Sequence, residues 1–322
     1  LKIVVTGSHL SKKYGFTVKE ITSNNFKIYK KIPINQKNNT ANDISKSSSL
    51  ILKKLSKSLS ILKPDLLILL GDRYEILIAA FVATLLKIPI AHISGGELTE
   101  GSYDNQFRHS VSKMSTLHFV SNKIYKNRLV QMGEYPNKVF NFGSLSLDNL
   151  KNDIFLSKKE IEKKFKIKFK KTNFLITFHP ETLGKRNLRN DFNEILTSIS
   201  KFKNYNFIFT ASNSDEEGNI INEMIKEYVH KNKNAFFVKS FGQKYYFSIL
   251  NTIDGVIGNS SSGIIEVPSF KIGTINIGKR QEGRIKCKSI IDCTATYKDI
   301  TRSIKRAVSI KFVKKISKIK NP

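Results

Sequence analysis

The sequence has few cysteines, no long apolar run and few acidic residues for its size. Its two cysteines, Cys287 and Cys293, lack the CxxC spacing of a metal or redox motif, so we expect free thiols in a cytoplasmic protein. No apolar run approaches the ~18 residues of a membrane span. The sequence therefore predicts neither a disulfide-rich scaffold nor a membrane-spanning protein.

Acidic residues are outnumbered: 26 Asp and Glu stand against 55 Lys and Arg, a net charge of +29. Such a basic chain suggests nucleic acid, an anionic membrane or a phosphorylated ligand as partner. The lysines, however, are spread over nearly every expected helix and loop. No helix-turn-helix, RNP-type strand or zinc-ligand set is visible. Such an even spread, together with many Asn and Ile residues, is what compositional drift in the coding sequence produces, and we expect no nucleic-acid and no membrane partner.

The stretch from Pro64 to His109 has the clearest pattern. Leu66–Leu70 is an unbroken apolar run, which predicts a parallel strand buried on both faces. Glu75–Lys87 has apolar residues at helical spacing, and Ile88–Ile93 is a second short apolar run. The order strand, helix, strand predicts two neighbouring parallel strands whose carboxyl ends meet at one edge, where open α/β sheets bind ligands.

Ionisable residues follow both of these strands. Asp72 and Arg73 come just after the first, and Glu97 follows the second in the sequence SGGE. Alternatively, Asp72 pairs with Arg73 or caps the next helix. That alternative is weakened by the number of ionisable groups in the second loop and the helix after it, which are Glu97, Glu100, Asp104, Arg108 and His109. Asp104 and Asn105 are also candidate caps of that helix.

Strands and helices alternate along the rest of the 322 residues. This alternation predicts an α/β protein with two Rossmann-like domains, residues 1–150 and 151–322, that face each other across a cleft. Residues 26–39 are expected to form an irregular loop, and a lysine-rich coil is expected after a basic helix that starts at Tyr297. The other expected strands are Leu1–Gly7, Thr116–Ser121, Val139–Gly143, Asn173–Phe178, Asn206–Thr210, Ala235–Val238 and Gly255–Gly258.

The motifs GDRYE (71–75), IPIAHISGGELTEGSYDN (88–105) and FRHSVSKMSTLHF (107–119) occur in this order. Together they resemble the hydrolysing UDP-N-acetylglucosamine 2-epimerases of the sialic and legionaminic acid pathways. The resemblance implies a GT-B-like pair of domains, a UDP-sugar substrate and a homo-oligomer. It implies no metal and no redox cofactor.

The resemblance also implies that segments of the family pattern are missing at both ends. Members of the family have a strand and a helix before the position of Leu1, and a last helix after the position of Pro322. We therefore expect a truncated chain. The missing strand would lie in the middle of the first sheet.

A second motif, GNSSSGIIEVPSF (258–270), follows the expected strand Gly255–Gly258. Serine hydroxyls at a helix N-terminus suit an anion, and Glu266 is a candidate acceptor for ribose hydroxyls. An ordinary serine cap with a glutamate in the first turn is the alternative. The motif and the segment GKRQEGR (278–284) are similar to the family's nucleotide-binding stretches, which implies as binding residues Asn259, Ser260, Ser261, Ser262, Gly263, Glu266, Arg280 and Arg284.

Besides His109, a second of the six histidines is a candidate for binding. His179 stands before Pro180 at the end of an expected strand, and its match to the family's HP position implies a contact with the diphosphate. A structural role is the alternative. His92 and His118 lie inside expected strands, and we predict that they belong to the core.

The chemistry that the resemblance implies is removal of the proton on C2 of the sugar with loss of UDP, followed by addition of water. We assign Asp72 and Asp104 as the acid–base pair and Glu97 as a third candidate. The substrate-positioning residues would be Arg73, Arg108, His109 and His179.

Ser94 and Asn105 stand where mammalian relatives carry carboxylates, which implies either a slowed hydrolytic step or a variant substrate such as a 4-acetamido-6-deoxy sugar nucleotide. Two further hypotheses stay open. One is a glycosyltransferase of the same two-domain architecture, and the other is an inactive truncated remnant.

Overall fold

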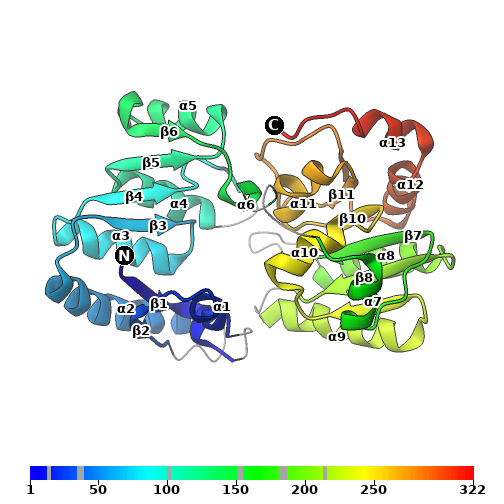
Figure 1. Ribbon diagram of the computed structural model, residues 1–322, viewed down its shortest axis with the longest axis horizontal. Helices are drawn as coiled ribbons and strands as arrows, with labels where there is room; N and C mark the ends of the chain where they lie inside the picture. Colours follow the sequence, from blue (N-terminus) through cyan, green and yellow to red (C-terminus); the bar gives the residue numbers. More distant parts are fainter. Residues whose placement is uncertain are drawn as a thin grey trace. The chain divides into compact units, whose positions relative to one another are not determined.

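The computed structural model describes residues 1–12, 16–34, 40–99, 103–148, 150, 155–180, 187–212 and 216–322. The chain divides into two compact units (Figure 1). Unit 1 comprises Leu1–Glu97 and Tyr103–Ser144, and unit 2 comprises Leu98–Ser102 and Leu145–Pro322. No helix in these described ranges is long and apolar enough to cross a membrane.

Unit 1 alternates strands with helices, and its strands pair in parallel. Its elements are β1 (Ile3–Thr6), the 3-10 helix η1 (Gly7–Leu10), α1 (Val18–Ser23), β2 (Ile28–Ile32), α2 (Ala41–Leu62), β3 (Leu67–Leu70), α3 (Tyr74–Leu85), β4 (Ile90–Ile93), α4 (Asp104–Lys113), β5 (Leu117–Val120), α5 (Lys123–Gln131), the 3-10 helix η2 (Pro136–Lys138) and β6 (Val139–Asn141).

The strands of unit 1 form two separate sheets. One has the order β3-β4-β5-β6, and the other contains β1 and β2 (Figure 1). Among the described residues β3 therefore pairs on one side alone, and its Ile68 and Leu70 are 55% and 57% exposed. The prediction that this strand is buried on both faces was wrong, because Ile68 and Leu70 lie on one face of the strand and that face is left uncovered in the described part of the chain.

Helix α2 packs against the interior of unit 1. Its first turn is capped by Thr40, whose hydroxyl accepts from the amide of Asp43 at 3.2 Å, and it ends at Lys63 in the left-handed conformation. Ile51, Leu55 and Leu59 recur at helical spacing and are buried in the core that α2 shares with α3. These apolar residues, spaced as on one side of a helix, therefore form the face that α2 buries.

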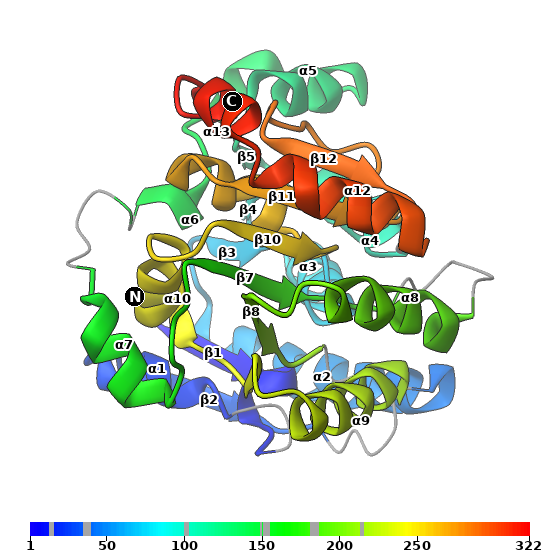
Figure 2. The same cartoon turned by 90° about the vertical axis from the view of Figure 1, so that its right-hand side faces the viewer.

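Unit 2 is a complete doubly wound sheet. Its elements are α6 (Leu145–Asp148), α7 (Lys158–Phe165), β7 (Thr172–Thr177), α8 (Leu188–Ser200), β8 (Tyr205–Thr210), α9 (Glu216–Lys231), β9 (Ala235–Val238), α10 (Gly242–Leu250), β10 (Gly255–Gly258), α11 (Ser262–Ile265), the 3-10 helix η4 (Val267–Phe270), β11 (Gly273–Ile277), β12 (Ile290–Cys293), α12 (Tyr297–Ala307) and α13 (Ile310–Ile316). The strand order is β12-β11-β10-β7-β8-β9, all parallel (Figure 2).

The sheet of unit 2 is covered on both faces. One core cluster joins alternate residues of its strands, such as Phe174 and Phe207, to α8, α9 and α12. The second cluster joins the intervening residues, such as Leu175 and Ile208, to α7 and α10. Burial on both faces is typical of strands in a parallel sheet with helices on either side.

Two segments expected to lack regular structure are ordered. Ile28–Ile32, within the predicted loop, forms β2, where Ile32 is fully buried while the two lysines face outward. Ile310–Ile316, within the predicted coil, forms α13, which is capped by Ser309 and buries Phe312 and Ile316. Both are short, amphipathic and rich in lysine, so their apolar pattern was too sparse to stand out.

Candidate active site

The loops after β3 and β4 lie at the same edge of the four-stranded sheet. The two strands pair in parallel, with Leu70 opposite Ile93, and the Gly71 amide donates to the Ile93 carbonyl oxygen at 3.2 Å. Asp72 and Glu97 follow these strand ends. This confirms that the sheet delivers both carboxylates to one edge.

Arg108 of α4 joins these two loops. Its guanidinium forms an ion pair with the Asp72 carboxylate and also donates to the Glu97 backbone carbonyl oxygen at 2.9 Å. Arg108 is only 2% exposed. Asp72 does not pair with Arg73, since Arg73 binds Glu75 instead, with Nε 3.1 Å from Oε2. Nor does Asp72 cap α3, whose N-cap residue is Arg73 without a side-chain cap.

The Glu97 loop is held at two further points. The Ser121 hydroxyl lies 3.2 Å from the Glu97 Oε1 atom, and Arg128 of α5 donates to the carbonyl oxygen of Gly96. Gly96 has a φ of +76°, and a Cβ there would lie 2.6 Å from the Tyr125 carbonyl oxygen, so only glycine fits. Glu97 itself is 7% exposed. Its carboxylate is therefore buried and fixed in place.

Asp104, Arg73 and His109 lie in the same unit. Asp104 is the first residue of α4 and directly follows Tyr103, the N-cap residue. Its charge interacts with that of Arg73. Neither Asp104 nor Asn105 is the N-cap residue that the sequence suggested. The pKa of His109 is lowered by burial and by the charges of Arg108 and Arg128. Glu100 lies outside the described residues.

In unit 2, His179 and Asn259 hold together the ends of β7 and β10. The His179 amide donates to Asn259 Oδ1 at 2.7 Å, and Asn259 Nδ2 donates to the His179 carbonyl oxygen at 2.8 Å. Arg280 Nη1 and Gln281 Nε2 both donate to the Asn259 carbonyl oxygen, at 3.1 and 2.8 Å. Burial and the charge of Arg280 lower the pKa of His179 to about 3. Its ring is therefore neutral at ordinary pH.

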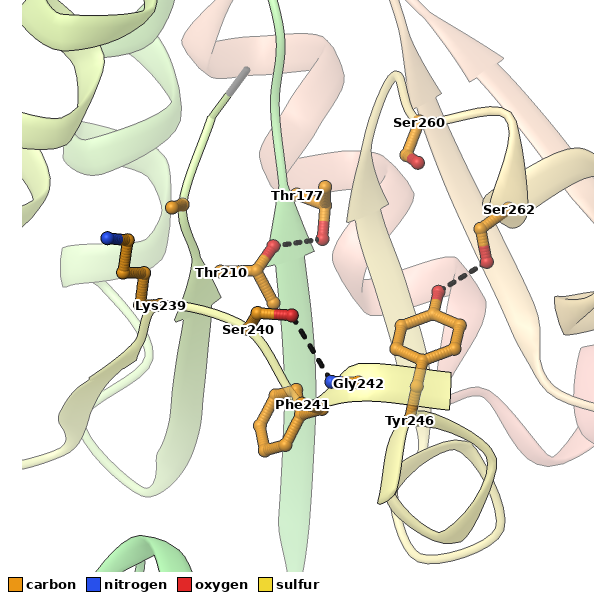
Figure 3. Close-up of a pocket in the computed structure, with 10 residues that line it drawn as sticks. Thr177, Thr210, Lys239, Ser240, Phe241, Gly242, Tyr246, Ser260 and Ser262 are labelled. Carbon is orange, nitrogen blue, oxygen red and sulfur yellow. Dashed lines mark hydrogen bonds between the residues drawn. The ribbon is translucent and has the colours of Figure 1, made fainter. Parts of the chain in front are cut away.

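A hollow of about 360 Å³ lies at the carboxyl edge of the unit 2 sheet, where β7, β8 and β9 end (Figure 3). The Tyr246 and Ser262 hydroxyls meet on one side, and the Thr177 and Thr210 hydroxyls lie 2.6 Å apart on another. The lining residues are Thr177, Thr210, Ala211, Lys239, Ser240, Phe241, Gly242, Tyr246, Ser260 and Ser262. Hydroxyls and one lysine make this hollow suited to an anionic, hydrogen-bonding ligand.

The motif at 258–270 forms less helix than expected. Helix α11 has four residues, and Glu266 stands at its C-cap, followed by η4. Glu266 Oε2 is buried and finds no partner among the described residues. Gly263 packs so closely on β11 that an added Cβ would lie 2.9 Å from Thr274 Cγ2. Ser261 is the N-cap residue of α11, and Arg284 is half-buried.

Sequence reasoning missed several residues that line the hollow, among them Thr177, Thr210, Lys239 and Tyr246. The first three follow or end the strands β7, β8 and β9, so topology alone could have identified them. Tyr246 lies inside α10, and no sequence signal marks it. Among the described residues no group of three or more His, Cys, Asp or Glu side chains could hold a metal ion.

The chain is similar to known proteins over its whole length. A family model described as UDP-N-acetylglucosamine 2-epimerase matches residues 1–322. A Campylobacter jejuni protein named GDP/UDP-N,N'-diacetylbacillosamine 2-epimerase (hydrolyzing) is 45% identical over 313 residues, which are 97% of this chain and 81% of that protein. The polysialic acid biosynthesis protein P7 of Escherichia coli is 39% identical over 100% of this chain and 82% of its own length.

The fold also matches solved structures. The UDP-GlcNAc 2-epimerase from Neisseria meningitidis, in a crystal structure with UDP-GlcNAc, superposes with a TM-score of 0.82 at 18% identity. The match covers 100% of this chain and 87% of the other. It establishes the architecture of two Rossmann-like units.

Proposed function

This chain belongs to the UDP-N-acetylglucosamine 2-epimerase family, and we propose that it is a hydrolysing 2-epimerase of a UDP-2-acetamido sugar. The preferred substrate in this proposal is a UDP-2,4-diacetamido-6-deoxy sugar, with UDP-GlcNAc as the alternative. The relative that is 45% identical is named for a diacetylbacillosamine substrate. Ser94 and Asn105, which replace carboxylates of mammalian relatives, favour the same choice.

The proposed reaction has two steps. A base removes the proton on C2 while the bond between C1 and the UDP oxygen breaks, which gives a 1,2-unsaturated sugar and UDP. Water then adds its hydroxyl to C1, and a proton is delivered to the opposite face of C2. The products are UDP and the free 2-epimeric sugar. Each step needs a positioned acid or base.

The observation that carries this proposal is the pair of carboxylates that Arg108 joins in unit 1. Asp72 and Glu97 come from loops after adjacent strands and are bound by one buried guanidinium, Asp72 through its carboxylate and Glu97 through its backbone. Crowded carboxylates in unlike surroundings are the usual way to separate acid and base roles. We assign Asp72 and Asp104 as the leading pair, and Glu97 as the third acid–base group.

Unit 2 would bind the UDP moiety. The hollow with Ser260, Ser262 and Lys239 offers hydroxyl donors and one positive charge for a diphosphate. Glu266, with a buried oxygen that lacks a partner among the described residues, is the proposed acceptor for ribose hydroxyls. Arg280, Arg284 and His179 stay candidates for the phosphates or the uracil.

The direct test incubates the protein with UDP-N,N'-diacetylbacillosamine and, separately, with UDP-GlcNAc in D2O. We expect free UDP and a free 2-epimeric sugar with one deuterium on C2, faster from the first substrate. A UDP-sugar epimerised without release of UDP would contradict hydrolysis.

Transfer of an unepimerised sugar to an acceptor would indicate a glycosyltransferase. Absence of any turnover, with a loose thermal transition, would indicate an inactive remnant. We also expect a homo-oligomer, which light scattering would detect.

A further inference from the structure

Arg108 is buried behind the two catalytic loops. It is 2% exposed, and its two terminal nitrogens bind different loops: one pairs with the Asp72 carboxylate, and the other donates to the Glu97 carbonyl oxygen. A planar guanidinium with donors in fixed directions can bind two acceptors in this way, whereas an ammonium cannot hold both at fixed angles. Arg108 therefore sets the position of one loop relative to the other.

A second pair of side chains supports the same loops. His92 Nε2 lies 2.9 Å from the carbonyl oxygen of Gly71, the residue before Asp72, and its Nδ1 lies 3.1 Å from the Ser112 hydroxyl. That hydroxyl also lies 3.0 Å from the Arg108 carbonyl oxygen. His92 and Ser112 are fully buried. Through Ser112 of α4 and His92 of β4, this network connects the backbone of Arg108 to Gly71, the residue that precedes Asp72.

The donors in this network can be assigned. The Gly71 carbonyl can only accept, so His92 Nε2 carries a proton. Burial lowers the pKa of His92 to about 4, so the ring is neutral and Nδ1 is an acceptor. The single proton of the Ser112 hydroxyl, which also lies within reach of the Arg108 carbonyl oxygen, serves one of these two acceptors at a time. Removing that hydroxyl would leave a buried ring nitrogen without a donor, which frees the Gly71 loop to shift.

We propose that Arg108, supported by His92 and Ser112, is a positioning residue that fixes Asp72 relative to Glu97 and does not bind the substrate. The inference rests on the proposed function. It reassigns Arg108, which the sequence suggested as a substrate contact, because a side chain this buried reaches the reacting sugar only through Asp72. A displacement of about 1 Å in such a pair costs on the order of 100-fold in rate.

The test compares Arg108→Lys and Ser112→Ala with the control Ser110→Ala. Ser110 lies on the same helix, but its hydroxyl bonds only the Gln106 carbonyl oxygen at an exposed position. We expect kcat to fall about 100-fold in Arg108→Lys and about 10-fold in Ser112→Ala, with unchanged values in the control. The Kd for UDP, measured by calorimetry, should stay within about twofold in all three.

Two results would overturn the inference. A Kd for UDP that rises tenfold or more in Arg108→Lys would make Arg108 a ligand contact. An unchanged kcat in both Arg108→Lys and Ser112→Ala would show that the network does not position the carboxylates.

A second readout does not depend on turnover. Hydrogen exchange of the amides in Gly71–Tyr74 and Ile93–Glu97 should quicken in Arg108→Lys and Ser112→Ala but not in Ser110→Ala. Suppose that the wild-type protein turns over no UDP-sugar, but that exchange in these loops quickens in Arg108→Lys and Ser112→Ala. The proposed function then fails and the positioning role stands. If exchange is unchanged in both variants, the positioning role fails.

Discussion

The two units share one architecture, but only unit 2 has an unbroken sheet. In unit 2 the first strand, β7, lies between β8 and β10, and its four central residues are buried. In unit 1 the described strands β1 and β3 each lack a neighbour at the corresponding place, and two of the four β3 residues are exposed.

The difference shows what an apolar run predicts and what it does not. LLILL in unit 1 and NFLIT in unit 2 both predict a strand of a parallel sheet, and both form one. Burial, however, depends on what covers the faces of the strand, which the run itself does not encode.

The units also differ in chemistry. The carboxylates of the proposed reaction, of which Glu97 is buried, belong to unit 1, and the hollow lined by hydroxyls and Lys239 belongs to unit 2. Substitutions in the two units should therefore separate turnover from nucleotide binding.

The largest effect is expected from Asp72→Asn, which removes an acid–base group at nearly constant shape. Turnover should fall by up to about 10⁴-fold, because general acid–base catalysis contributes about that much. The control is Asp65→Asn, an exposed aspartate before β3 at the opposite end of the strand, which should leave turnover unchanged. A Kd for UDP that changes as much as turnover would mean that Asp72 binds the nucleotide.

The next largest effect is expected from a substitution in the core of unit 2, compared with one in β3 of unit 1. Phe174→Ala in β7 should lower the free energy of unfolding by about 3–5 kcal/mol, because the ring is fully buried. Ile68→Ala in β3 should cost less than about 1 kcal/mol, since half of that side chain already meets water. Urea denaturation followed by circular dichroism measures both. Equal losses would contradict an open edge at β3.

Acid should weaken both units through buried histidines, of which His92 in unit 1 and His179 in unit 2 have pKa values of about 4 and about 3. In the unfolded chain His92 and His179 titrate near 6.5, but in the folded protein their pKa values are about 4 and about 3. The unfolded state therefore binds more protons below pH 6.5, and the stability present above that pH falls as the pH drops toward the folded values.

Between pH 7 and pH 5 each histidine should cost about 2 kcal/mol. In His92→Gln and in His179→Gln, the loss of unfolding free energy between pH 7 and pH 5 should be smaller by that amount. Urea denaturation at both pH values measures it. An unaltered pH dependence in either variant would mean that its histidine is not kept neutral by folding.

The smallest effect concerns the hollow of unit 2. Lys239→Ala should weaken UDP binding about fivefold, or about 1 kcal/mol, because an exposed lysine offers a diphosphate one screened charge. Lys233→Ala removes the same charge before β9, at the opposite end of the strand from Lys239, and should leave the Kd unchanged. Equal weakening of UDP binding in both variants would mean that the lysines act only through the net charge of the protein.

Most of the fold followed from the sequence, and the site followed in part. The bounds of β9 and β10 agree with the predicted ones, because short apolar runs are bounded there by polar residues or glycine. The shared edge of Asp72 and Glu97 followed from parallel pairing alone. The partner of Asp72 did not, because Arg108 is 36 residues away and a long-range ion pair leaves no local pattern.

The edge of β3 that pairs with no other strand in the described part of the chain bears on how the protein behaves at high concentration. Unpaired strand edges are templates for strands of other molecules, and natural proteins often protect them with lysine. The edge strand β2 carries Lys30 and Lys31, whereas β3 reads LILL and carries no charge. Aggregation of this protein should therefore proceed through β3. Replacing Ile68 with a charged residue should reduce it.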